Sequence, residues 1–131
     1  MRHLLTAILL LVAVIHLLPL AGVAGVGRLQ HLYGVAVSDP NLEILLRHRA
    51  VLFGMLGALL ALAAFQPALQ VAGIVAGSLS LASFVALAWS VGGFNPALGR
   101  VVMVDLVALG LLIMAGGMLL VQGFAAPAIR D

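Results

Sequence analysis

Two residue types are missing from the sequence: it contains no cysteine and no lysine, and charged residues make up only 8% of the chain. Without cysteine there can be no disulfide, thiolate metal site, iron–sulfur cluster or cysteine nucleophile in this chain. The six basic residues are all arginines, and they are too few and too scattered to form a nucleic-acid-binding surface. Thiol chemistry and nucleic acid binding are therefore excluded.

Apolar residues dominate what is present. The chain has 131 residues, of which 65% are hydrophobic, and its mean hydropathy is +1.31. A soluble domain, by contrast, carries about 25% charged residues. The composition predicts an integral membrane protein, and the length suits a single domain over residues 1–131.

Four apolar runs are long enough to cross about 30 Å of hydrocarbon as helices that rise about 1.5 Å per residue. They predict an all-α, four-helix transmembrane bundle with helices over about 4–26, 40–65, 69–91 and 96–124. Pro19 should kink the first helix or loosen its last turns. Residues 27–38 are predicted to form a polar loop, and the tail 125–131 is too short to fold alone.

Asp39-Pro40 and Asn95-Pro96 each predict a helix start, because the first side chain can cap free amide hydrogens and proline suits the first helical position. The two starts lie 56 residues apart. The pairs that are identical at this offset include Pro40 and Pro96, Leu42 and Leu98, and Gly54 and Gly110. The repeat predicts two helical hairpins of the same orientation, and it places Arg49 level with Asp105.

Charged residues concentrate where the second and fourth helices begin. Ionisable residues at the edge of the hydrocarbon are costly, so they mark either a site or a structural clamp. The candidate ligand-binding residues combine this cluster with polar residues of the adjoining loops: Glu43, Arg47, Arg100, Asp105, His31, Tyr33 and Asn95. They form either a salt-bridged clamp or a polar pocket that is open to an amphipathic ligand.

Helix geometry predicts the pairing within this cluster. Glu43 and Arg47 stand in the favourable i,i+4 order. Arg47 also shares a helix face with small residues, which let membrane helices approach closely. That face consists of Ala50, Gly54, Gly57 and Ala61. If it meets the fourth helix, Arg47 pairs with Asp105, whereas His48 and Arg49 point away towards lipid headgroups.

His16 stands alone in the middle of the first apolar run. A neutral imidazole that bonds to a neighbouring helix is one interpretation, and haem or metal ligation is the other. The four histidines show no i,i+3 or i,i+4 pairing and no H-E-x-x-H arrangement. No metal site is therefore predicted, and the sequence identifies no cofactor.

The distribution of arginines bears on the orientation in the membrane. Four arginines lie at the loop face and two at the face of the termini, which by the positive-inside rule would place the loops in the cytoplasm. However, Arg47, Arg49 and Arg100 lie within helices beside acidic residues, where they need not report on orientation. Without them the count is one against two plus the terminal amine, so both termini are predicted to be cytoplasmic.

Residues 32–54 (LYGVAVSDPNLEILLRHRAVLFG) and 91–98 (VGGFNPAL) resemble a family of small uncharacterised four-helix proteins of proteobacterial inner membranes. The resemblance implies the same fold and membrane. Some members of that family carry the label phosphopantetheine adenylyltransferase, but such an enzyme needs a parallel sheet and a nucleotide-binding loop that this sequence lacks. The architecture is also similar to DoxX-like proteins, some of which are linked to quinone chemistry. Small multidrug exporters differ, because their first helix carries a glutamate where this chain has His16.

Three functions are compatible with this pattern. The first is a binding or accessory protein whose pocket at the loop end takes a lipid, quinone or isoprenoid-like amphiphile. The second is a small membrane enzyme, of isomerase or oxidoreductase type, that acts on such a ligand with Glu43 or Asp105 as acid or base and His31 or Tyr33 assisting. The third is a dimeric small transporter, since the small-residue faces also predict a homo-oligomer.

Overall fold

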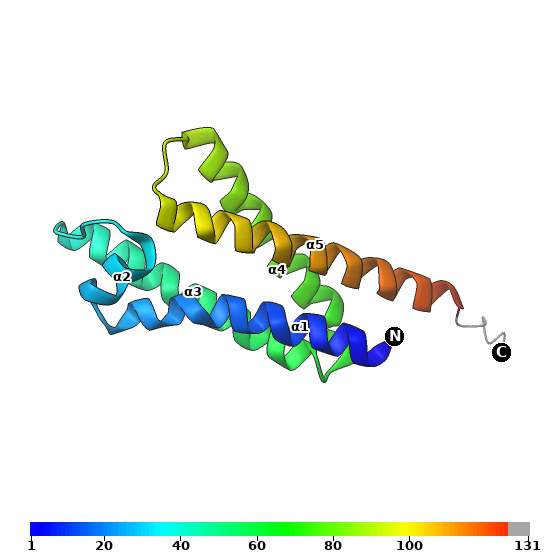
Figure 1. Ribbon diagram of the computed structural model, residues 1–131. Helices are drawn as coiled ribbons and strands as arrows, with labels where there is room; N and C mark the ends of the chain where they lie inside the picture. Colours follow the sequence, from blue (N-terminus) through cyan, green and yellow to red (C-terminus); the bar gives the residue numbers. More distant parts are fainter. Residues whose placement is uncertain (126–131) are drawn as a thin grey trace.

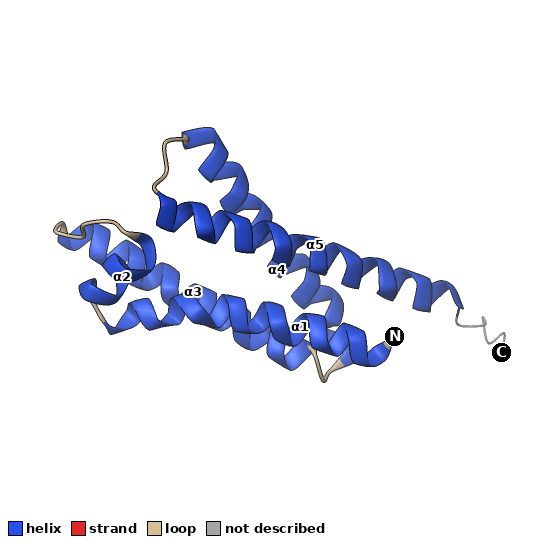
Figure 2. Cartoon of the chain, in the orientation of Figure 1, coloured by secondary structure: helices blue, strands red, loops and turns tan. Residues whose placement is uncertain are grey.

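The computed structural model describes residues 1–125, and over these residues the chain consists of helices joined by short connections without any strand (Figures 1 and 2). The elements are α1 (Arg2–Leu17), the 3-10 helix η1 (Leu18–Ala24), α2 (Val26–Tyr33), α3 (Pro40–Ala63), α4 (Pro67–Val91) and α5 (Pro96–Ala125). The all-α prediction is confirmed. Most of the predicted tail, residues 126–131 with Arg130, lies outside the described residues.

Four segments in the described part of the chain are long and apolar enough to cross a membrane. They are Arg2–Ala24, Pro40–Ala63, Pro67–Val91 and Pro96–Gly123. The protein is therefore a multi-pass membrane protein. The N-terminus and the end of α5 lie at one end of the bundle, and α2 and the connection between α4 and α5 lie at the other, which we call the loop end (Figure 1).

The first span changes its helix type at the loop end. The α-helix stops at Leu17, and the 3-10 helix η1, with Pro19 in its first turn, continues to Ala24. Proline cannot donate the backbone hydrogen bond that an α-helix needs at this position. The loosening of the last turns that Pro19 predicted is therefore present. The tighter 3-10 geometry lets the chain turn towards α2.

The predicted loop 27–38 is partly wrong, because most of it folds as the short helix α2. Leu29 and Tyr33 are buried four residues apart, while Arg28, Gln30 and His31 are exposed, so the segment is an amphipathic helix. The helix ends at Gly34, which has a left-handed φ of 63° and donates its N–H to the Gln30 carbonyl at 2.8 Å. Glycine is favoured in this conformation because it has no Cβ.

The hydrophobic core lies towards the end of the bundle that holds the N-terminus. Its buried residues come from all four long helices and include Leu9 and Val12 of α1, Leu60 of α3, Leu81 of α4 and Leu112 of α5. α1 packs on α3 and on α5, and α4 packs on α3 and on α5. A second, smaller cluster of Leu29, Tyr33 and Val37 holds α2 against the loop end.

The small-residue face of α3 packs against the first span, so the prediction that it meets the fourth helix is wrong. A Cβ added to Gly57 would lie 2.8 Å from Leu17 Cγ, and one added to Gly54 would lie 2.7 Å from Leu20 Cδ1. The glycines of α4, Gly73 and Gly77, likewise face Ala63 and Leu112 within the chain. These small-residue faces are occupied inside the bundle, so the homo-oligomer that the sequence predicts would have to use other faces.

Candidate functional site

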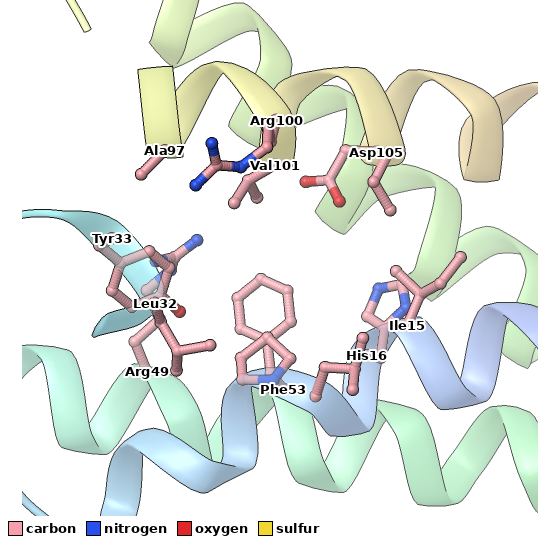
Figure 3. Close-up of a pocket in the computed structure, with 13 residues that line it drawn as sticks. Ile15, His16, Leu32, Tyr33, Arg49, Phe53, Ala97, Arg100, Val101 and Asp105 are labelled. Carbon is pink, nitrogen blue, oxygen red and sulfur yellow. The ribbon is translucent and has the colours of Figure 1, made fainter. Parts of the chain in front are cut away.

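A cavity of about 200 Å³ lies at the loop end, between α5 on one side and α1, η1, α2 and α3 on the other (Figure 3). Its polar lining consists of His16, Tyr33, Arg49, Arg100 and Asp105. Its apolar lining consists of Ile15, Leu18, Pro19, Leu32, Phe53, Ala97, Val101 and Val104. We call this cavity the loop-end pocket.

His16 forms the deepest polar group of the pocket wall. The side chain is fully buried, its ring stacks on Phe53 with centroids 5.6 Å apart, and its Nδ1 lies 2.9 Å from the Val12 carbonyl oxygen. A carbonyl oxygen only accepts hydrogen bonds, so Nδ1 must carry the proton, and Nε2 of the neutral ring is an acceptor. Among the described residues Nε2 has no partner.

Asp105 extends from α5 into the same pocket (Figure 3). It lies nine residues after Pro96, which is about 14 Å along the helix axis, and its side chain is only 5% exposed. No hydrogen bond or ion pair from the described residues reaches its carboxylate. Carboxylates at such positions are costly unless a partner compensates them, so Asp105 is an unusual feature of this site.

Arg49 is the charged group that interacts electrostatically with Asp105. Its guanidinium carbon lies 4.8 Å from the ring centroid of Phe53, 5.0 Å from that of Phe84 and 5.3 Å from that of Tyr33. Three aromatic faces stabilise the cation through their quadrupoles. The prediction that Arg49 meets lipid headgroups is therefore wrong: the side chain is held between α2, α3 and α4 and lines the pocket.

Tyr33 and Arg100 complete the polar lining. Tyr33 is buried at the end of α2, and this burial raises the pKa of its phenol, while Arg49 acts against that shift and Asp105 adds to it. The phenol therefore stays neutral and can donate a hydrogen bond. Arg100 is exposed at the edge of the pocket, where its charge remains accessible.

Asn95 joins the two loop-end segments that carry these residues. Its Oδ1 accepts the Leu98 N–H at 2.8 Å and so caps α5, while its Nδ2 donates to the carbonyls of Tyr33 and Gly34 at 2.9 and 3.2 Å. Asn95 does not line the pocket. It fixes the start of α5 against the end of α2, and it thereby positions Tyr33 opposite Arg100.

We expect Asn95→Ala to lower the free energy of unfolding by about 1–2 kcal/mol, because it removes a helix cap and two hydrogen bonds to α2. Asn95→Asp is the matched control, since it keeps the capping oxygen but loses the Nδ2 donor. Its second carboxylate oxygen would face the carbonyl oxygens of Tyr33 and Gly34, which only accept, so its loss should equal or exceed that of the alanine variant. Unfolding in mixed micelles measures both, and an aspartate variant as stable as the wild type would show that the bonds to α2 contribute nothing.

The remaining predicted site residues lie outside the pocket. Glu43 and Arg47 form the predicted i,i+4 ion pair at 3.0 Å, on the outer surface of α3. His31 is exposed on α2. The predicted pairing of Arg47 with Asp105 is wrong, because Arg47 pairs with Glu43 and is exposed, whereas Asp105 shares the pocket with Arg49. The structure thus brings together Tyr33, Arg100 and Asp105 and separates them from Glu43, Arg47 and His31.

Sequence reasoning missed the roles of His16, Arg49 and Phe53 in this site. A signal for Arg49 was present, since the 56-residue offset places it level with Asp105. For His16 the signal was a single polar residue in an apolar run, which does not reveal the direction of the side chain. Phe53 lies four residues after Arg49, on the same helix face, so it follows from the placement of Arg49.

Comparisons with protein-family models, with curated proteins and with solved structures find no match to this chain. The function must therefore be argued from the site alone.

Proposed function

We propose that this protein binds a membrane amphiphile, of the lipid, quinone or isoprenoid-like class, with its polar head in the loop-end pocket. One observation carries the proposal: His16 Nε2 is buried without a hydrogen-bond partner among the described residues, and His16 lines the same cavity as Asp105, whose carboxylate has no ion pair with a described residue. Buried polar groups are normally hydrogen-bonded, and leaving one unsatisfied costs about 1–3 kcal/mol. A bound polar head would supply the missing partners.

The walls of the pocket suit the apolar part of such a ligand. Leu18 of η1 and Val104 of α5 line the pocket and are 61% and 44% exposed, so the pocket is open between these two elements. Both residues belong to membrane-spanning segments, and the opening therefore faces hydrocarbon. An apolar tail could leave through it and remain in the bilayer while the head stays among the polar groups.

Filling the pocket should remove the ligand. We expect Val101→Phe, on the pocket wall, to lower the amount of amphiphile that co-purifies by about tenfold or more, because the larger side chain takes up volume that the head needs; tenfold corresponds to about 1.4 kcal/mol of binding free energy. Val107→Phe is the matched control, since Val107 is 62% exposed on the same helix and does not line the pocket. Mass spectrometry of the extracted small molecules, normalised to protein, measures both. Equal amounts from the two variants would contradict the proposal.

A membrane enzyme is the second candidate function, and the shared cavity of His16 and Asp105 is the observation that favours it. A histidine and a carboxylate in one mainly apolar pocket could act as base and acid on a bound head. Glu43 and His31 no longer take part in this alternative, because both lie outside the pocket. An enzyme would leave chemically different amphiphiles in membranes that contain the wild type and in membranes that contain Asp105→Asn, whereas a binding protein would not.

We further propose a location in a bacterial inner membrane, on the resemblance described above, with both termini in the cytoplasm. Because the chain lacks cysteine, single cysteines can be labelled without interference. Ser38→Cys at the loop end should react with a membrane-impermeant maleimide added to spheroplasts, and His3→Cys should react only after the membrane is opened. Both positions are exposed. The reverse pattern would show that the termini face the periplasm.

A further inference from the structure

We infer that the head of the ligand is an uncharged ring that carries a hydroxyl group, of the phenol class, and that this hydroxyl donates its hydrogen bond to His16 Nε2. The inference rests on the proposed function and specifies the ligand. It follows from three properties of the pocket, namely the tautomer of His16, the balance of charge and the volume.

The tautomer decides the polarity of the missing partner. Nδ1 of His16 lies 2.9 Å from the Val12 carbonyl oxygen, so the single proton of the neutral ring resides on Nδ1 and Nε2 presents a lone pair. The ligand must then donate. A carbonyl, an ether or a quinone oxygen only accepts, and it would leave Nε2 unsatisfied, whereas a hydroxyl satisfies it.

The balance of charge disfavours an anionic or cationic head. Arg49 and Asp105 have opposite charges and line the same cavity, and the guanidinium of Arg49 is already surrounded by the rings of Tyr33, Phe53 and Phe84. A cationic head would therefore have no free counter-ion in the pocket, and an anionic head would have one only at the edge, where Arg100 lines the cavity. The further cation, Arg100, is exposed at the edge, where it contacts the surroundings of the head rather than its buried part.

The volume and the walls favour a single ring. An engineered apolar cavity of about 150 Å³ binds benzene, and the loop-end pocket has about 200 Å³. The ring of Phe53 lies nearly parallel to that of His16, with an interplanar angle of 28°, and it forms part of the wall. Aromatic rings pack favourably against such faces. A ring with one small substituent fits, and the hydrocarbon-facing opening accepts an alkyl chain attached to it.

The test compares two probes that differ at a single oxygen, which carries a hydrogen in one and a methyl group in the other. 4-Hexylphenol has a hydroxyl, and 4-hexylanisole carries a methyl ether that cannot donate. We expect the purified protein in micelles to bind the phenol about tenfold more tightly than the ether, since satisfying a buried acceptor is worth about 1–2 kcal/mol. In protein labelled with ¹⁵N-histidine, the Nε2 resonance of His16 should shift with the phenol and stay in place with the ether.

His16→Leu provides the matched variant. It should bind the two probes equally, and its affinity for the ether should remain close to that of the wild type, which would show that the pocket is intact. Equal binding of both probes by the wild type would overturn the inference, as would tighter binding of 4-hexylbenzoate, because the arginines would then select an anion. Absence of binding by both probes would also overturn it. These outcomes concern the identity of the ligand. The proposed function is tested separately, by the loss of co-purified amphiphile in Val101→Phe.

Discussion

The double variant Arg49→Gln/Asp105→Asn should lose less stability than the sum of the two single losses, by about 1 kcal/mol or more. Either single substitution leaves one charge in a site that hydrocarbon surrounds. Arg49 and Asp105 form no direct ion pair, so each loss should be smaller than the about 3–5 kcal/mol that breaking a fully buried pair costs. The double variant removes both charges, so the penalty for the orphaned charge disappears.

Arg47→Gln/Asp105→Asn is the matched control for this cycle. Arg47 lies on the same helix as Arg49 but forms its ion pair with Glu43 at 3.0 Å. The stability lost in Arg47→Gln should therefore add to that lost in Asp105→Asn within about 0.5 kcal/mol, as for independent sites. The free energy of unfolding in mixed micelles measures both cycles. Coupling of Asp105 to Arg47 but not to Arg49 would contradict the arrangement of the pocket.

The sequence predicted those parts of the fold that depend on composition and on local capping. Apolar runs predicted the four spans, and the Asx-Pro pairs predicted starts at Pro40 and Pro96, where α3 and α5 begin. The side chains of Asp39 and Asn95 accept backbone N–H bonds at these starts, each at 2.8 Å. Such signals are visible in the sequence because they act between residues that are neighbours in the chain.

The neighbours of each helix could not be predicted in the same way. The small-residue face of α3 predicts a close approach of another helix, but small residues suit any partner. The structure places the first span on this face, and that choice turns Arg49 rather than Arg47 towards Asp105. Two residues along a helix correspond to about 200° of rotation, so Arg47 and Arg49 lie on nearly opposite sides of α3. Predicting the wrong neighbour for this helix therefore selected the wrong arginine.

Some of the candidate residues line the loop-end pocket and others do not, for the same reason. Tyr33, Arg100 and Asp105 line the pocket because they lie at the loop end, which the chain order alone indicates. His16 belongs to the pocket through the direction of its ring, which depends on the hydrogen bond to Val12 and on the stacking with Phe53. Neither contact has a signature in the spacing of polar residues, so a single histidine in an apolar run could not be assigned.

Gly57→Ala should lower the free energy of unfolding by about 1–3 kcal/mol, because the added methyl overpacks the contact between α1 and α3. Its Cβ would lie 2.8 Å from Leu17 Cγ and 3.1 Å from the backbone oxygen of Ala13. The Leu17 side chain is 38% exposed and can turn away, but the backbone oxygen of Ala13 cannot, so α1 and α3 must move apart. Leu17 directly follows His16, and Gly57 is one turn from Phe53, so the separation should also disturb the stacked rings and reduce the amount of bound amphiphile.

Two glycine variants serve as controls for this effect. In Gly54→Ala the added methyl meets Leu20 Cδ1 at 2.7 Å, but Leu20 is 40% exposed and its side chain can turn away, so the loss should be smaller. Gly110→Ala adds a methyl with nothing within 4 Å and should cause no loss, because alanine is the better helix former. If all three variants unfolded at the same denaturant concentration, the contact between α1 and α3 would not be close-packed at Gly57. His16 and Phe53 would then owe their stacking to other contacts.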